Sequence, residues 1–117
     1  MKILYVDDEQ INRLFFNMNF AKLFPIVLAS NGAEGLKKLK ENPDISVIVS
    51  DMKMPGMNGI EFITEAKKEK EDLPCYILTG FDITVDIHEA IETKTVERYF
   101  QKPIDVDAMK EELTKCN

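Results

Sequence analysis

The sequence has few of the residues that build metal centres from sulfur and nitrogen or cross-link secreted domains. Two cysteines and one histidine occur among its 117 residues. Cys75 lies in an apolar run and Cys116 stands next to the last residue, a spacing that matches neither a metal site nor a disulfide framework. His88 has no second histidine with which to share a metal ion, so it is interpreted as a solvated surface residue. We expect two free thiols in a reducing compartment.

The chain also lacks an excess of positive charge and any long hydrophobic run. It contains 15 basic and 21 acidic residues, which give a net charge of -6, whereas nucleic-acid affinity comes largely from clustered lysine and arginine. The first apolar stretch, ILYV, is too short for the core of a signal peptide or for a membrane span. We therefore expect a cytoplasmic protein that binds neither nucleic acid nor membranes directly.

Alternating apolar and helical segments indicate the fold. Strand-like runs at 2–6, 25–29, 46–50, 75–79 and 97–100 alternate with segments of helical periodicity at about 10–23, 32–41, 59–70, 83–91 and 105–115. The first, third and fourth runs lack polar alternation, which is typical of strands covered on both faces. Residues 1–117 are thus predicted to form a single α/β domain, a (βα)5 doubly wound parallel sheet of the flavodoxin-like type with strand order 2-1-3-4-5.

The first helical segment carries two apolar stripes. One stripe has the spacing i, i+3, i+4, i+7 and is predicted to face the core; it consists of Ile11, Leu14, Phe15 and Met18. The other lies on the opposite side of the helical wheel and would mark a contact surface if it were exposed; it consists of Phe16, Phe20 and Leu23. The alternative is that the helix ends early and residues 20–24 fold back into the interior.

Polar side chains follow four of the predicted strands. Asp7 and Asp8 end the first strand, Asp51 the third, Thr79 the fourth and Lys102 the fifth. Ligands of doubly wound sheets bind outside the carboxyl ends of the strands, near the point where the strand order reverses. Because these four strands are neighbours in the predicted order, three carboxylates, a hydroxyl and an ammonium group should converge there.

Three crowded carboxylates would raise one another's pKa unless a cation lies among them. Mg²⁺ is suited to such oxygen ligands and to phosphate, and beside it a carboxylate can attack phosphorus and form an aspartyl phosphate. The adjacent Asp7 and Asp8 are interpreted as metal ligands. Asp51 stands alone at a strand end before a Met/Pro/Gly loop and is interpreted as the phosphoacceptor, with Thr79 and Lys102 as donors to phosphoryl oxygens.

Each of these residues has a simpler interpretation by itself. Asp8 could cap the following helix, Thr79 could belong to a turn that ends a strand, and Lys102 could be a solvated charge. Tyr99, just before the last strand ends, could be an ordinary core or interface ring. The combination favours phosphoryl chemistry, because independent turn residues are not expected to place these groups at four neighbouring strand ends.

Four motifs carry a family resemblance. YVDDE, VIVSDMKMPGMNG, ILTG and YFQKP occur in this order over nearly the whole chain, and together they resemble the receiver domain of two-component response regulators, the CheY-like family. The resemblance implies that Asp7 and Asp8 hold Mg²⁺, that Asp51 is phosphorylated and also binds the ion, and that the backbone carbonyl of Lys53 is a further metal ligand.

The resemblance also assigns roles beyond the metal site. It makes Thr79 the switch hydroxyl, Tyr99 the aromatic ring that moves with it, and Lys102 the lysine that contacts the phosphoryl group. It implies a cis bond before Pro103. Phe81, two residues beyond Thr79, would border the phosphoryl group, and we expect its bulk to restrict the attacking water and slow hydrolysis.

The function implied is that of a phosphoacceptor switch in a phosphorelay and not that of a metabolic enzyme. A histidine kinase or histidine phosphotransfer protein would donate the phosphoryl group, docking on the first helix through Phe16, Phe20 and Leu23. The face formed by the fourth helix, fifth strand and fifth helix would then signal to an effector protein or a fused output domain. The alternative is a non-phosphorylated pseudo-receiver that only binds proteins.

Two rivals from other classes are disfavoured by single features. A haloacid dehalogenase-like phosphatase would need a second acid at the position of Lys53, and a flavodoxin-type flavin carrier would need a phosphate loop where DDEQIN stands. Three positions depart from the usual receiver pattern. Phe24-Pro25 stands where a glycine commonly precedes the second strand. Gly35 stands where alanine is usual, at a cost of up to about 1 kcal/mol in a helix, and Lys94 stands where a helix usually ends in glycine, so that this end is expected to close differently.

Overall fold

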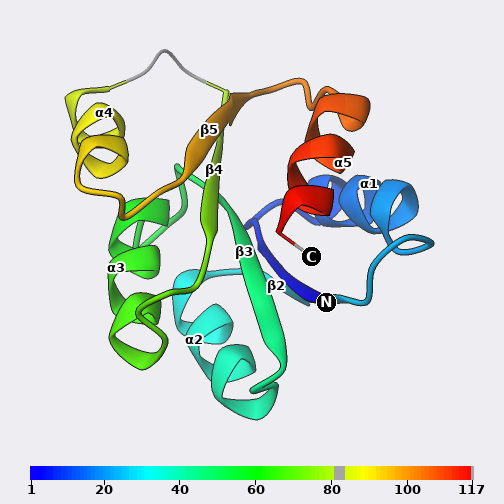
Figure 1. Ribbon diagram of the computed structural model, residues 1–117, viewed down its shortest axis with the longest axis horizontal. Helices are drawn as coiled ribbons and strands as arrows, with labels where there is room; N and C mark the ends of the chain where they lie inside the picture. The colour runs from blue at the N-terminus through cyan, green and yellow to red at the C-terminus, as the bar shows by residue number, and fades with distance from the viewer. Residues whose placement is uncertain (81–83, 117) are drawn as a thin grey trace.

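A computed structural model of the protein describes residues 1–80 and 84–116, and in them strands and helices alternate along the chain (Figure 1). The strands are β1 (Lys2–Val6), β2 (Ile26–Ala29), β3 (Ile45–Asp51), β4 (Cys75–Thr79) and β5 (Arg98–Gln101). The helices are α1 (Gln10–Phe20), α2 (Gly32–Glu41), α3 (Gly59–Glu69), α4 (Val85–Glu92) and α5 (Val106–Lys115). All strand pairs are parallel in the order β2-β1-β3-β4-β5, so the predicted doubly wound fold is confirmed.

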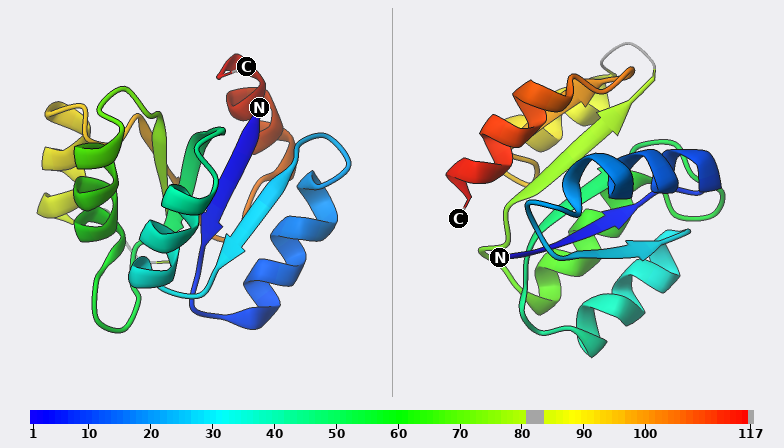
Figure 2. Two further views of the ribbon diagram at one scale, coloured as in Figure 1. Left: turned by 90° about the horizontal axis from the view of Figure 1, so that it is seen from below. Right: turned by 90° about the vertical axis from the view of Figure 1, so that its right-hand side faces the viewer.

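Helices cover both faces of the sheet, as the two views of Figure 2 show. Alternate residues of each strand point to opposite faces. In β1, Leu4 and Val6 join the core beneath α2, α3 and α4, whereas Ile3 and Tyr5 join the core beneath α1 and α5. This two-sided burial explains why β1, β3 and β4 are almost continuously apolar.

The prediction for α1 was wrong about which stripe is buried. Phe16 and Phe20 are completely buried, and Phe24 joins the same core after the helix ends at Phe20. The backbone N–H groups of Leu23 and Phe24 both donate to the carbonyl oxygen of Phe20, which turns the chain back toward the sheet. The alternative of an early helix end was therefore correct. Leu23 alone of the expected outer stripe is exposed.

The stripe expected in the core lies on the surface instead. The exposed fractions are 70% for Ile11, 54% for Leu14, 45% for Phe15 and 68% for Met18. The physical reason lies in the sheet beneath α1, where the Tyr5 ring stacks on Phe16 with centroids 4.0 Å apart and an interplanar angle of 7°. Rotating the helix to bury the other stripe would expose these large aromatic rings to water.

Two of the three departures from the usual receiver pattern, at Lys94 and at Gly35, have structural explanations. Lys94 adopts the left-handed conformation with φ 62°, and the hydrogen bonds that follow α4 run from Thr95 N–H to the Ala90 carbonyl and from Lys94 N–H to the Ile91 carbonyl. This is the Schellman arrangement, so the helix closes in the usual way with a lysine in glycine's conformation, and the expectation that this end closes differently was wrong. At Gly35, a Cβ atom would lie 2.7 Å from the Phe62 ring, so the helix needs glycine there to pack on α3.

No helix in the part of the chain that the structure describes is long and apolar enough to cross a membrane.

Candidate functional site

The functional residues predicted from sequence come together at the carboxyl ends of four neighbouring strands. Asp7 and Asp8 follow β1, Asp51 is the last residue of β3, Thr79 the last of β4, and Lys102 follows β5. A cleft of about 680 Å³ opens at this edge, and Asp8, Asp51, Thr79 and Lys102 all contribute to its wall. The parallel sheet therefore places the groups as the strand order predicted.

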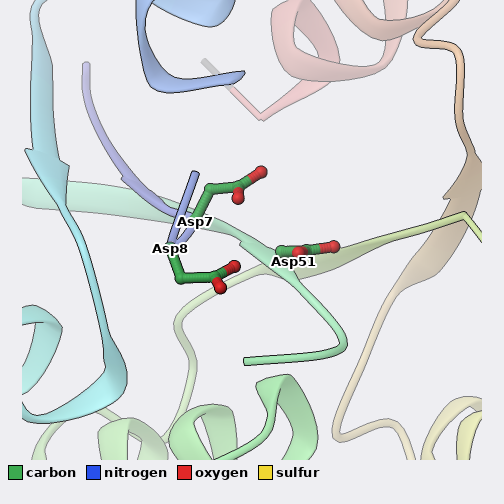
Figure 3. A group of neighbouring side chains, drawn as sticks. All are labelled: Asp7, Asp8 and Asp51. Atoms are coloured by element: carbon green, nitrogen blue, oxygen red, sulfur yellow. The ribbon is translucent and has the colours of Figure 1, made fainter. Parts of the chain in front are cut away.

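Three carboxylates form the acidic part of the site (Figure 3). One oxygen from each of Asp7, Asp8 and Asp51 lies within 4.8 Å of the others. Asp7 is completely buried, Asp51 is nearly so, and Asp8 is exposed. Clustered carboxylate oxygens are the ligands that Mg²⁺ prefers, so this group could hold a divalent ion. Lys53 lines the same cleft, and the role of its backbone carbonyl stays a prediction.

Donors from β1, from the loop that follows it and from α1 fix the position of Asp7. The Tyr5 hydroxyl donates to its Oδ2 at 2.8 Å, and the Glu9 backbone N–H donates to its Oδ1 at 3.0 Å. Arg13 on α1 donates to the backbone carbonyl of Asp7 at 2.7 Å. Tyr5 was not identified from the sequence as part of the site. The available signal was a tyrosine two residues before an aspartate in an otherwise aliphatic strand, since residues i and i+2 of a strand lie on the same face.

The Lys102 ammonium bridges two of the carboxylates. Its Nζ lies 3.1 Å from Oδ1 of Asp51 and 3.4 Å from Oδ2 of Asp7. Burial acts to lower the pKa of Lys102, but the charges of Asp51 and Asp7 outweigh it and raise the pKa above its ordinary value. The Lys102 backbone N–H donates to the Thr79 carbonyl at 2.8 Å, and the peptide bond to Pro103 is cis. The lysine is thereby held charged and directed at Asp51.

Asp51 is in an environment that disfavours its charge. Burial raises the pKa of this carboxyl to about 6, the Asp7 carboxylate contributes to the rise, and Lys102 opposes it. The Met52 N–H donates to Asp51 Oδ1 at 3.1 Å. One cation, Lys102, is therefore not enough to offset burial and the neighbouring acid, and a second positive charge would be favourable at this position.

The start of α3 closes in tightly behind Asp51. A Cβ atom on Gly59 would lie 2.4 Å from the Asp51 carbonyl oxygen, so only glycine fits at the first residue of this helix. The helix is capped by Asn58 and Glu61, whose side chains and backbone N–H groups exchange hydrogen bonds in a capping box. This cap fixes the loop between β3 and α3 that forms one wall of the cleft.

The remaining predicted residues flank the acidic group. Thr79 is buried at the end of β4 and reaches the cleft wall, and Tyr99 on β5 is half-buried and packs against the core beneath α2, α3 and α4. Their switching roles stay predictions. Phe81, expected to shield the site from water, lies outside the described residues.

Sequence and structure comparisons agree on one family. A sequence model described as the response regulator receiver domain matches residues 3–114. A chemotaxis protein CheY homolog from Campylobacter jejuni is 31% identical over 117 positions, covering 97% of this chain and 89% of its own. Sporulation initiation phosphotransferase F from Bacillus subtilis is 34% identical, covering 97% and 91%. A receiver domain protein from Clostridium thermocellum is structurally similar, with a TM-score of 0.86, 28% identity and coverage of 98% and 92%.

Proposed function

Because the chain belongs to the response regulator receiver domain family, whose members are signalling phosphoacceptors and not metabolic enzymes, we propose that Asp51 accepts a phosphoryl group from a phosphohistidine. The donor is a histidine kinase or a histidine phosphotransfer protein. The observation that carries this proposal is the acidic group of Asp7, Asp8 and Asp51 with the Lys102 ammonium 3.1 Å from Asp51. The protein acts in the cytoplasm, where such donors operate.

In the transfer step, a carboxylate oxygen of Asp51 attacks phosphorus, a P–O bond forms and the P–N bond to the donor imidazole breaks. The imidazole nitrogen keeps the electron pair of the broken bond. Asp51 is suited to this step because it is ionised at neutral pH although its pKa is raised to about 6. The rigid end of β3 and the capped start of α3 hold its carboxylate at the cleft wall.

Asp7, Asp8, Asp51 and the backbone carbonyl of Lys53 are the residues that would hold Mg²⁺, and the bound ion would supply positive charge against the transferring phosphoryl oxygens. Lys102 turns its ammonium from Asp51 to one phosphoryl oxygen, and the Thr79 hydroxyl donates to another. Both residues already lie at the wall of the cleft with Asp51. The phosphoryl group would therefore bind among groups that already line one cleft.

The output follows from the position of Thr79 between the site and β5. When Thr79 is drawn toward the phosphoryl group, the space it leaves lets Tyr99 turn inward, and an equilibrium between two states of the protein shifts. The surface formed by α4, β5 and α5 changes with it. An effector protein or a fused output domain reads this change. A pseudo-receiver that only binds proteins is the second candidate, which would need no phosphoryl group.

The donor docks on the exposed stripe of α1, which replaces the stripe expected from sequence. This stripe consists of Ile11, Leu14, Phe15 and Met18. Phe15 also lines an apolar hollow of about 230 Å³ with Pro103 and Ile104, and Asn12 lines both this hollow and the acidic cleft. A donor helix covering the stripe would therefore place its phosphohistidine beside Asp51 while burying apolar surface.

The proposal is tested by intact mass after incubation with acetyl phosphate and Mg²⁺. Wild-type protein is expected to gain one phosphoryl group, and Asp51→Asn protein or wild-type protein with a chelator is expected to gain none. An adduct of the same size on the variant would move the phosphoacceptor elsewhere. No adduct on the wild type, together with no response of Tyr99 fluorescence to beryllium fluoride, would favour the binding-module candidate.

A further inference from the structure

The buried Tyr5 contacts the acidic group of Asp7, Asp8 and Asp51 through its hydroxyl, which donates to Asp7. Tyr5 is completely buried in β1, and its ring stacks on Phe16 of α1 with centroids 4.0 Å apart. Phe16 in turn contacts Phe20, with ring centroids at 4.5 Å. This packing from α1 fixes the direction of the Tyr5 hydroxyl, which lies 2.8 Å from Oδ2 of Asp7.

Packing alone does not require a hydroxyl at this position. A phenylalanine would fill the same space against Phe16, and burying a hydroxyl is costly unless it finds a partner. The partner here is a completely buried carboxylate. A carboxylate can only accept, so the Tyr5 hydroxyl is the donor in this hydrogen bond.

We propose that Tyr5 is a positioning residue of the Mg²⁺ site, whose hydroxyl holds one oxygen of Asp7 and so orients that carboxylate before the ion binds. The inference rests on the proposed function, because it concerns the same metal site. A metal-binding side chain that also accepts a hydrogen bond from a neighbouring protein group is restricted to fewer orientations. Loss of such a partner typically costs 10-fold to 100-fold in metal affinity.

Because Tyr5 holds Asp7, the orientation of Asp7 does not depend on Lys102. Lys102 Nζ lies 3.4 Å from the same oxygen of Asp7 and 3.1 Å from Asp51. When the ammonium turns toward a phosphoryl oxygen, Asp7 loses that contact but keeps the Tyr5 hydrogen bond and the Glu9 N–H on its other oxygen. Asp7 therefore stays oriented throughout the transfer.

The test compares two Tyr→Phe variants in the absence of any phosphodonor. Tyr5→Phe removes the proposed contact. Tyr76→Phe is the matched control, because Tyr76 is also buried in a strand of the same core and its hydroxyl also donates to a carboxylate, Oε2 of Glu112 at 3.1 Å. Urea unfolding at increasing Mg²⁺ concentration gives the affinity from the Mg²⁺-dependent gain in stability, which cancels any difference in basal stability.

We expect Tyr5→Phe to raise the Mg²⁺ dissociation constant at least about tenfold, which lowers the Mg²⁺-dependent stabilisation by about 1.4 kcal/mol at high ion concentration. Tyr76→Phe should match the wild type. In acetyl phosphate labelling, Tyr5→Phe should need more Mg²⁺ for half-maximal rate but reach the wild-type rate at saturation. Equal Mg²⁺ affinities of Tyr5→Phe and wild type would overturn the inference, whereas a wild type without Mg²⁺ affinity would overturn the proposed metal site itself.

A second measurement covers the case in which Tyr5→Phe does not fold. The chain has three tyrosines and no tryptophan, so the double variant Tyr76→Phe/Tyr99→Phe leaves Tyr5 as the only long-wavelength chromophore. Its absorbance should change when Mg²⁺ is added, because the ion draws charge from the oxygen that accepts its hydrogen bond. A spectrum that does not respond to Mg²⁺ at concentrations that stabilise this variant would overturn the inference.

Discussion

Replacing Asp51, the proposed phosphoacceptor, with its neutral isostere asparagine should stabilise the protein when no Mg²⁺ is present. Burial raises the pKa of Asp51 to about 6 from an ordinary 3.8, with Asp7 adding to the rise. A difference of this size corresponds to about 3 kcal/mol of preference for the neutral carboxyl in the folded state. Solvent in the open cleft screens part of it, so we expect Asp51→Asn to raise the free energy of unfolding by about 1–3 kcal/mol at pH 8.

The effect has a defined pH range. In the unfolded chain Asp51 ionises near pH 3.8, and in the folded protein near pH 6. The wild type therefore loses stability from this group as the pH rises from about 4 to about 6, and the loss is complete above that range. The advantage of Asp51→Asn should shrink toward zero as the pH falls through the same interval. Saturating Mg²⁺ should also reduce it, because the ion stabilises the ionised wild type more than the variant.

The assay is urea unfolding followed by circular dichroism at pH 8 and at pH 4.5, with a chelator and with Mg²⁺. Asp44→Asn is the control, since the exposed Asp44 carboxylate pairs with Lys2 at 2.9 Å and a hydrogen bond from Lys2 lowers the pKa of Asp44. This control should not gain stability at pH 8. A variant Asp51→Asn that is no more stable than the wild type at pH 8, or equally advantaged at both pH values, would refute the electrostatic argument.

Three further predictions concern α1, α4 and α2. Replacing both Ile11 and Met18 with serine should lower the rate of phosphoryl transfer from a cognate histidine kinase at least about tenfold, as for loss of an apolar interface contact, and should leave labelling by acetyl phosphate unchanged. The control is serine at the exposed Val85, and equal slowing with both donors would contradict docking on α1. Lys94→Gly should raise the unfolding free energy by up to about 1 kcal/mol, because φ at this position is positive, and a lower midpoint in thermal unfolding would refute it. Gly35→Ala should destabilise the protein by about 1–3 kcal/mol despite alanine's better helix propensity, because the added methyl overlaps the Phe62 ring; a stabilised variant in urea unfolding would show that the ring moves aside without cost.

The sequence predicted the strands and most helix limits because both faces of the sheet are covered. The apolar runs of β1, β3 and β4 have no polar alternation to confuse their assignment, and helical periodicity separates them. The predicted boundaries of α2 agree with the structure at both ends, and those of β1 and β4 do so as well. The predictions for α1 that were wrong concerned not the existence of the helix but its rotation about its own axis and its last turn, because the helix ends at Phe20 and not at residue 23.

Periodicity could not choose that rotation. Both stripes of α1 are apolar at helical spacing, and a helical wheel gives no information about the surface against which the helix packs. The structure buries Phe16 and Phe20 because the Tyr5 ring and the rest of the α1-facing core accept aromatic side chains there. The same kind of contact explains Gly35, which sequence reasoning counted as a cost and the structure shows to be a close approach of α2 to Phe62.

The sequence by itself determined the architecture and the meeting of Asp7, Asp8, Asp51 and Lys102. Parallel strands end at a common edge, so the residue that follows each strand is placed by strand order alone. Only the tertiary structure decided which face of α1 is exposed and that the Tyr5 hydroxyl donates to Asp7. Those outcomes depend on side-chain packing between elements far apart in sequence, and a local pattern carries no information about the shape of the surface that it meets.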